Sequence, residues 1–176
     1  MLAASDYLSP HFSLALFPVD AAPAAEKAAT VVVSDPDYNV WQSNYSPNGR
    51  WLAFVANSRK HGTTTVEIVS SAGGPATAWL HVTTSAAADK PRWSPDGRRL
   101  YYTERGSVGY NVWTVPFDPE RGRLTGAASQ VTRFTNPDHQ LSPDLGSAEP
   151  SISRTFMILP IMERRGSIWV LDGVDR

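Results

Sequence analysis

Apolar and polar residues alternate along several short stretches of the chain, and these stretches recur. Leu52 and Phe54 fall on one face of a predicted strand, and Leu100 and Tyr102 take the matching positions 48 residues later. Alternation with a period of two is typical of half-buried β-strands. No apolar run approaches the roughly 20 residues needed to span a bilayer. The pattern therefore predicts a protein built from short strands.

The two strands belong to a longer repeat. Residues 45–54 (YSPNGRWLAF) match residues 93–102 (WSPDGRRLYY) in register. The proline pre-sets φ at the start of a turn, Asn48 or Asp96 can bond back to its own backbone, and the glycine supplies a positive φ. The offset of 48 residues falls within the blade length of β-propellers, about 40–50 residues. The repeat predicts a β-hairpin in each of two successive blades.

Other strands recur with similar spacing. The third strand of each blade is predicted at residues 14–20, 65–70, 113–118 and 168–172, and the short fourth strand at 30–33, 79–82 and 130–134. A third hairpin at 152–159 keeps a serine and an apolar strand but lacks the Pro-Asp-Gly turn. The similar stretch 141–144 (LSPD) is interpreted as a loop, because no strand follows it directly.

The predicted fold class is all-β, a single partial β-propeller over residues 1–176 with about three to four antiparallel four-stranded blades, two complete and two partial. The pieces are a half blade (12–33), two complete blades (40–82 and 89–134) and a terminal incomplete blade (150–172). A closed propeller needs about 4 to 8 blades, so we expect apolar faces and strand edges at both ends.

Three arrangements are compatible with exposed apolar faces and strand edges at both ends of the partial propeller. The chain could be the C-terminal part of a longer propeller, two copies could close one ring as a homodimer, or the sheets could persist as an open wedge. The first is favoured because the chain begins in mid-blade without an export signal. Residues 1–10 carry no Lys or Arg and do not form a signal peptide.

The Ser-Pro-Asp-Gly-Arg motif at 94–98, followed by an apolar strand, resembles the repeat of TolB-like propellers. These are WD-repeat-like bacterial blades, also found in prolyl-oligopeptidase-type enzymes and fused to receptor-like Ser/Thr kinases and winged-helix regulators. The resemblance covers roughly residues 12–172, and the ending at 163–171 is similar to the C-terminal blade of such fusion proteins. It implies a periplasmic or extracytoplasmic location and says little about activity.

The amino-acid composition excludes several classes of binding partner and of reactive site. The net charge of −1 provides no basic surface for nucleic acid and no polybasic segment for an anionic membrane. The absence of cysteine excludes disulfides, thiolate metal sites and a cysteine nucleophile. We therefore expect no nucleic-acid partner and no direct insertion into a membrane.

No catalytic constellation stands out. A Gly-x-Ser-x-Gly elbow is lacking, and residues 106–109 (GSVG) are interpreted as a hairpin tip. Glu149 and Glu163 have no evident partner at catalytic spacing. Gly73 and Gly74 lack the Lys-Ser/Thr sequel of a phosphate loop and are interpreted as a hairpin turn.

The sequence also predicts no metal and no cofactor. The histidines are scattered without a His-x-x-x-His pair, at positions 11, 61, 81 and 139. Asp35, Asp37 and Asp138 could suit a hard cation in a propeller channel. They are more simply explained as turn residues in Asp-Pro-Asp and Asn-Pro-Asp sequences ahead of first strands.

Aromatic residues supply the only candidates for ligand contact. Trp93, Trp113 and Trp169 occupy repeated strand positions, which predicts packing between blades. Tyr38 and Trp41 lie at the entry to a first strand, which lines the channel mouth in a propeller. They are the predicted ligand-binding residues.

We therefore expect a non-enzymatic module that binds a protein, a peptide or a small ligand through its loops and channel. The remaining blades of a longer chain are the other expected partner. Two alternatives stay open: the sensor domain of a receptor-like Ser/Thr kinase or winged-helix regulator, and the propeller of a prolyl-oligopeptidase-type peptidase.

Overall fold

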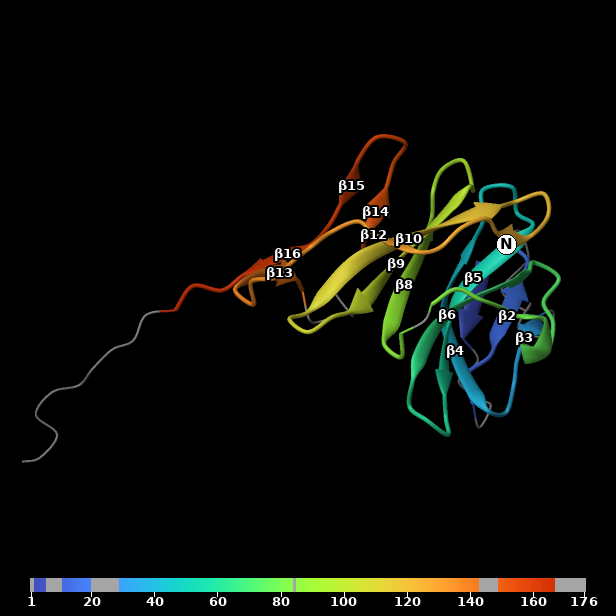
Figure 1. Cartoon of the computed structure of the whole chain (residues 1–176). Helices are drawn as coiled ribbons and strands as arrows, with labels where there is room; N and C mark the ends of the chain where they lie inside the picture. Colours follow the sequence, from blue (N-terminus) through green and yellow to red (C-terminus); the bar gives the residue numbers. More distant parts are fainter. Residues whose placement is uncertain (1, 6–10, 20–28, 84, 143–148, 167–176) are drawn as a thin grey trace, which may run out of the picture.

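The computed structural model describes residues 2–5, 11–19, 29–83, 85–142 and 149–166. These residues form antiparallel sheets that lie side by side (Figure 1). A short 3₁₀ turn, η2 (Ala76–Ala78), lies between two strands of the second sheet. In the described residues no helix has the length and apolar character required to cross a membrane. The structure confirms the predicted fold class, an all-β partial propeller.

The first sheet has three strands in the order β1-β2-β3. They are β1 (Leu2–Ser5), β2 (Leu14–Phe17) and β3 (Thr30–Val33). The bounds of β3 agree with the predicted fourth strand of a broken blade. The sequence pattern does not predict β1, because its four residues show neither alternation nor a flanking turn signal.

The next two sheets are antiparallel meanders, and each one follows the chain. The second sheet comprises β4 (Tyr38–Tyr45), β5 (Trp51–Ser58), β6 (Thr64–Ser70) and β7 (Leu80–His81). The third comprises β8 (Ala88–Trp93), β9 (Arg99–Arg105) and β10 (Tyr110–Asp118), with β11 (Arg123–Leu124) and β12 (Ser129–Gln130) both pairing with β10. Leu52 and Leu100 thus lie in equivalent strands of two separate, neighbouring sheets.

The repeated turn has the same geometry in both sheets. Gly49 and Gly97 have φ values of +70° and +68°. The Ser46 hydroxyl donates to Asn48 Oδ1 at 2.7 Å, and the Ser94 hydroxyl donates to Asp96 Oδ1 at 2.5 Å. Asparagine therefore replaces aspartate in the turn without changing its hydrogen bonds.

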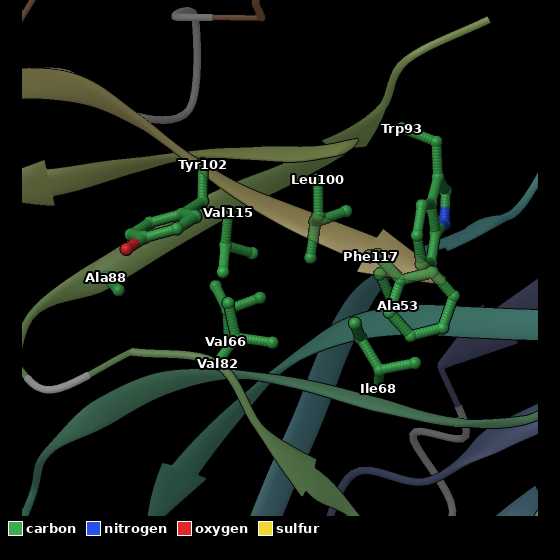
Figure 2. Close-up of a cluster of buried hydrophobic side chains, with 10 residues drawn as sticks. All are labelled: Ala53, Val66, Ile68, Val82, Ala88, Trp93, Leu100, Tyr102, Val115 and Phe117. Carbon is green, nitrogen blue, oxygen red and sulfur yellow. The ribbon is translucent and has the colours of Figure 1, made fainter. Parts of the chain in front are cut away.

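The larger core lies between the second and third sheets. Figure 2 shows Val66 and Ile68 of β6 pointing toward Leu100, Val115 and their neighbours across the interface. Each of these side chains is at most 1% exposed. The predicted packing role of tryptophan is found for Trp93, which is 8% exposed in this core, and for Trp113, which packs against it.

The smaller core joins the first and second sheets. Leu52 and Phe54 of β5 pack there with Leu14 and Val33. Because successive residues of a strand face opposite sides, Ala53 of the same strand belongs to the larger core. Both faces of β5 are therefore covered by other sheets, which explains its nearly continuous apolar sequence.

The C-terminal region forms two small pairs of strands. They are β13 (His139–Leu141) with β16 (Ile161–Glu163), and β14 (Ser151–Ile152) with β15 (Met157–Ile158). Interpreting LSPD purely as a loop was wrong at its first residue, because Leu141 ends β13. The hairpin of β14 and β15 projects beyond the main stack (Figure 1). The predicted strand at 168–172, with Trp169, lies outside the described residues.

Candidate functional site

A cavity of about 300 Å³ opens on one rim of the second sheet. Strand pairing brings the start of β4, the end of β5, the start of β6 and the end of β7 to this rim, since Tyr38 pairs with Ser58 and Glu67 pairs with His81. The cavity is lined by Tyr38, Ser58, His61, Thr63, Thr65, Glu67, Ala76, Trp79 and His81. The predicted ligand residue Tyr38 is therefore part of a real concavity.

Aromatic rings form one wall of this rim cavity. Tyr38 and Trp79 meet edge to face with ring centroids 5.3 Å apart, and Trp79 meets Phe54 of the smaller core at 5.0 Å. The Trp79 indole N–H donates to the Gly74 carbonyl at 3.1 Å. The wall is thus anchored to the core and held in one orientation, as a preformed binding surface requires.

A carboxylate and an imidazole form the polar part of the cavity. The Glu67 side chain is only 8% exposed, and its Oε1 lies 2.8 Å from both the Thr65 hydroxyl and His81 Nδ1. A carboxylate accepts hydrogen bonds, so Nδ1 of His81 carries the proton of the shared bond. The imidazole is 57% exposed, and the described residues give its Nε2 atom no partner. Nε2 is the ring atom that can bond a ligand.

Trp41, the second predicted ligand residue, lies away from Tyr38. It pairs with Val55 across β4 and β5, at the start of a bulge, and is not among the residues that line the rim cavity. Neither residue's contact with a ligand is tested by the structure, and both assignments stay predictions.

A second cavity of about 300 Å³ occupies the equivalent rim of the third sheet. Its lining residues Gly106, Asn111 and Trp113 follow Ser58, Thr63 and Thr65 of the first cavity by 48 positions, the offset of the repeat. The stretch 106–109 is the tip of the hairpin between β9 and β10, as predicted. The rim therefore presents a concavity at the same place in two consecutive blades.

The aspartates proposed as turn residues do lie in turns. The Asp37 amide donates to Asp35 Oδ1, and the Asp138 amide donates to Asn136 Oδ1, each at 2.9 Å. In the described part of the chain, no cluster of three or more His, Asp or Glu residues could hold a metal ion. The pair Gly73–Gly74 lies in a longer connection that includes η2, not in a tight hairpin.

Two associations of residues escaped the sequence analysis. His61 and His81 are 20 positions apart but line one cavity. The succession of antiparallel strands is the signal that could have brought them together, since His61 lies in the hairpin between β5 and β6 and His81 lies on β7, which pairs with β6. Glu149 pairs with Lys90 and Arg92 of β8, which the sequence did not indicate.

Burial shifts the pKa values of Asp89 and Arg92, two charged residues of β8. Desolvation raises the pKa of Asp89 above its usual range, although the neighbouring Lys90 amide and the positive charges of Lys90 and Arg92 oppose the change. Desolvation also lowers the pKa of Arg92. Opposite shifts in an acid and a base at one place indicate a region from which water is partly excluded.

Comparison with known proteins agrees on the fold. No protein-family model and no curated protein matches the sequence. Among solved structures, TolB from Acinetobacter baumannii is similar at a TM-score of 0.58 and 16% identity, over 92% of this chain and 37% of TolB. Oligopeptidase B from Leishmania major matches at a TM-score of 0.52 and 15% identity, over 81% of this chain and 19% of its own.

The tricorn protease matches at a TM-score of 0.50 and 12% identity, over 78% of this chain and 16% of its own. This chain thus spans little more than a third of TolB and less of the two peptidases. At these sequence identities the structural similarity supports a shared fold and nothing further. The repeated Ser-Pro-Asx-Gly hairpins agree with that fold. The chain has a TolB-like propeller fold.

Proposed function

We propose that the chain is a non-enzymatic recognition module whose rim binds a peptide or a protein loop. The observation that supports this most directly is the recurrence of a rim cavity at the same place in two consecutive blades. A ligand that follows the rim could fill both cavities, as an extended peptide does. Rigid sheets with variable loops are suited to such recognition.

The chemistry of the first cavity favours a ligand with both apolar and polar groups. Tyr38 and Trp79 offer an aromatic wall, while the ordered Glu67–His81 pair and the hydroxyls of Ser58 and Thr65 offer hydrogen bonds. Polar side chains outnumber apolar ones in the lining of this cavity, so it suits a ligand that makes several hydrogen bonds while one part of it packs against the aromatic wall.

Two alternatives differ in the kind of larger protein to which the module belongs. The blades could be the sensor of a receptor-like kinase or winged-helix regulator, or they could be the propeller of a prolyl-oligopeptidase-type peptidase. The similarity to oligopeptidase B and the tricorn protease favours the second alternative only at the level of fold. In each alternative the role of the propeller is to bind a ligand.

We propose that the end faces of the stack are covered by further blades of the same ring or by a second copy. The exposure of Phe156 and Ile158, at 77% and 72%, supports a covering partner. A periplasmic or extracytoplasmic location fits the resemblance to TolB-like propellers and belongs to the same proposal.

A selection from a phage-displayed library of random peptides tests the proposed binding. We expect enriched peptides to bind the purified chain, with the Kd raised at least about tenfold by His81→Ala or Tyr38→Ala, as for central interface residues. Isothermal titration calorimetry with a synthetic peptide gives the Kd of each variant.

His139→Ala is the matched control. His139 is 52% exposed and lies 3.5 Å from Glu163, so it resembles His81 in exposure and in its glutamate neighbour but lies on β13. Binding that is equally sensitive to His139→Ala and His81→Ala, or insensitive to both, would contradict the rim assignment. Peptide hydrolysis by the chain that one substitution abolishes would contradict the non-enzymatic assignment.

A further inference from the structure

Two residues share an unusual backbone conformation. Gln42 and Lys90 have φ values of +52° and +55°, and in the described part of the chain they are the only residues other than glycine with positive φ. They are 48 positions apart, and each lies in a bulge of its blade's first strand. Strain of this kind persists only where the surroundings impose it, and it is concentrated at functional sites.

The two bulges hold neighbouring first strands together. The Lys90 amide donates to the side-chain oxygen of Gln42 at 3.2 Å, and the Asn44 side-chain amide donates to the Pro91 carbonyl at 3.2 Å. The Trp93 indole N–H donates to the Asn44 carbonyl at 3.1 Å. The backbone that carries Lys90 and Arg92 is therefore tied to β4 of the second sheet.

The side chains of Lys90 and Arg92 converge on one carboxylate. Lys90 Nζ, in a side chain only 2% exposed, lies 2.7 Å from Glu149 Oε1. Arg92 Nη2 pairs with the other oxygen, Oε2, and the Arg92 side chain is 22% exposed. Each oxygen thus has its own cationic donor, an arrangement that recognises the shape and the charge of a carboxylate.

The two sides of this contact differ in how firmly they are held. The cations belong to β8, which lies in the third sheet beside the second. Glu149 lies 59 positions after Lys90 along the chain, its side chain is 52% exposed, and it precedes the short β14–β15 hairpin. That hairpin carries the exposed Phe156 and Ile158. The cations are thus held within a sheet, whereas Glu149 is half exposed and leads toward a hairpin with exposed apolar side chains.

We propose that Lys90 and Arg92 form a carboxylate-binding site that Glu149 fills in cis and that an acidic side chain of a peptide partner takes when Glu149 is displaced. Asp89, an acidic group whose charge interacts with both cations, lies beside them in the strand. This site is separate from the rim cavities and does not depend on them.

Chemical rescue tests the site. Glu149→Ala removes the resident carboxylate, and acetate is then the probe. We expect acetate to raise the Tm of Glu149→Ala by at least about 2 °C more than that of the wild type. Acetamide, which has a similar shape without the charge, and chloride at the same ionic strength should have no such effect.

Two further variants control for general effects. Arg92→Met in the Glu149→Ala background should abolish the acetate response. Glu120→Ala, which opens the exposed Arg50–Glu120 pair at the same 2.7 Å distance, should show no response. An acetate shift that is equal in all variants, or absent from Glu149→Ala, would overturn the proposal.

A direct binding measurement covers the case in which Glu149→Ala fails to fold cooperatively. Glu149→Gln keeps the size of the side chain, and calorimetric titration with an oligoglutamate peptide then measures the open site. We expect oligoglutamate to bind Glu149→Gln at least about tenfold more tightly than the wild type, and oligoglutamine to bind neither. Equal binding of oligoglutamate to both proteins would overturn the proposal.

Discussion

Two phenylalanines show how differently the centre and the C-terminal part of this molecule are built. Phe54 lies on a strand of the second sheet and is 0% exposed, whereas Phe156 lies in the turn between β14 and β15 and is 77% exposed. Both follow a serine-containing hairpin signal in the sequence. A neighbouring sheet covers the side chain of Phe54. The described residues leave most of the Phe156 side chain uncovered. A blade of this fold becomes stable only when another sheet lies against its apolar face.

The largest expected effect is the difference in stability between alanine substitutions at Phe54 and at Phe156. Phe54→Ala should reduce the free energy of unfolding by about 3–5 kcal/mol, because it leaves a cavity in a closely packed core. Phe156→Ala should change it by less than about 0.5 kcal/mol. Urea unfolding followed by tryptophan fluorescence measures both values. Equal effects of the two substitutions would contradict the difference in packing.

A smaller effect is expected at the contact between blades. Gly122 has a φ of +63°, and a Cβ there would collide with the Trp51 indole of the preceding blade. Gly49 has a φ of +70°, but a Cβ there meets nothing within 4 Å. Gly49→Ala should cost about 1–2 kcal/mol through backbone strain alone, and Gly122→Ala should cost about 1–3 kcal/mol more through overpacking.

Gly166→Ala is the control in the C-terminal region. Its Cβ would also meet nothing within 4 Å, and its φ lies outside the left-handed range. Thermal unfolding of the three alanine variants should therefore rank Gly122 as the most costly and Gly166 as nearly neutral. A Gly122 variant as stable as the Gly49 variant would show that the blades do not meet at Trp51.

The smallest effect concerns the two repeated turns. Bonds from the Ser94 hydroxyl and the Arg98 amide lower the pKa of Asp96, so the folded state favours the ionised carboxylate. This stabilisation is complete above the usual pKa of aspartate, about 4. It is lost as the pH falls through the lowered pKa of the folded state.

Asp96→Asn should therefore make the acid side of the stability profile shallower and change stability near neutral pH by less than about 1 kcal/mol, since Asn48 makes the same bonds in the first turn. Urea unfolding from pH 7 to pH 2 measures the profile. A profile that is unchanged by Asp96→Asn would show that the turn does not contribute to the acid dependence.

The repeated hairpins could be predicted because their signals are local. Proline, Asx and glycine specify the turn, and alternation specifies the strand that follows, so the fold class and strands such as β5 and β9 were predicted correctly. The short strands β1, β11 and β13 have two to four residues each. Their position depends on what they pair with, and no local pattern marks them. The predicted blade boundaries themselves stay predictions.

The candidate sites were less predictable because they depend on pairing between distant residues. Tyr38 could be selected from its place before a first strand, but its neighbour Trp79 lies 41 positions later along the chain. The pairing of Lys90 with Glu149 joins residues 59 positions apart. Nothing local distinguishes Glu149 from any solvated glutamate.

Native-state hydrogen exchange, followed by mass spectrometry, tests most directly whether stacking between sheets holds this fold. The account predicts that the amides of β5, β6, β9 and β10 exchange slowest and with similar opening free energies, because these strands share one core. The amides of β14 and β15 should exchange fastest among the strands. Protection of β14 and β15 equal to that of β5 and β9, or independent opening of the second and third sheets, would contradict it.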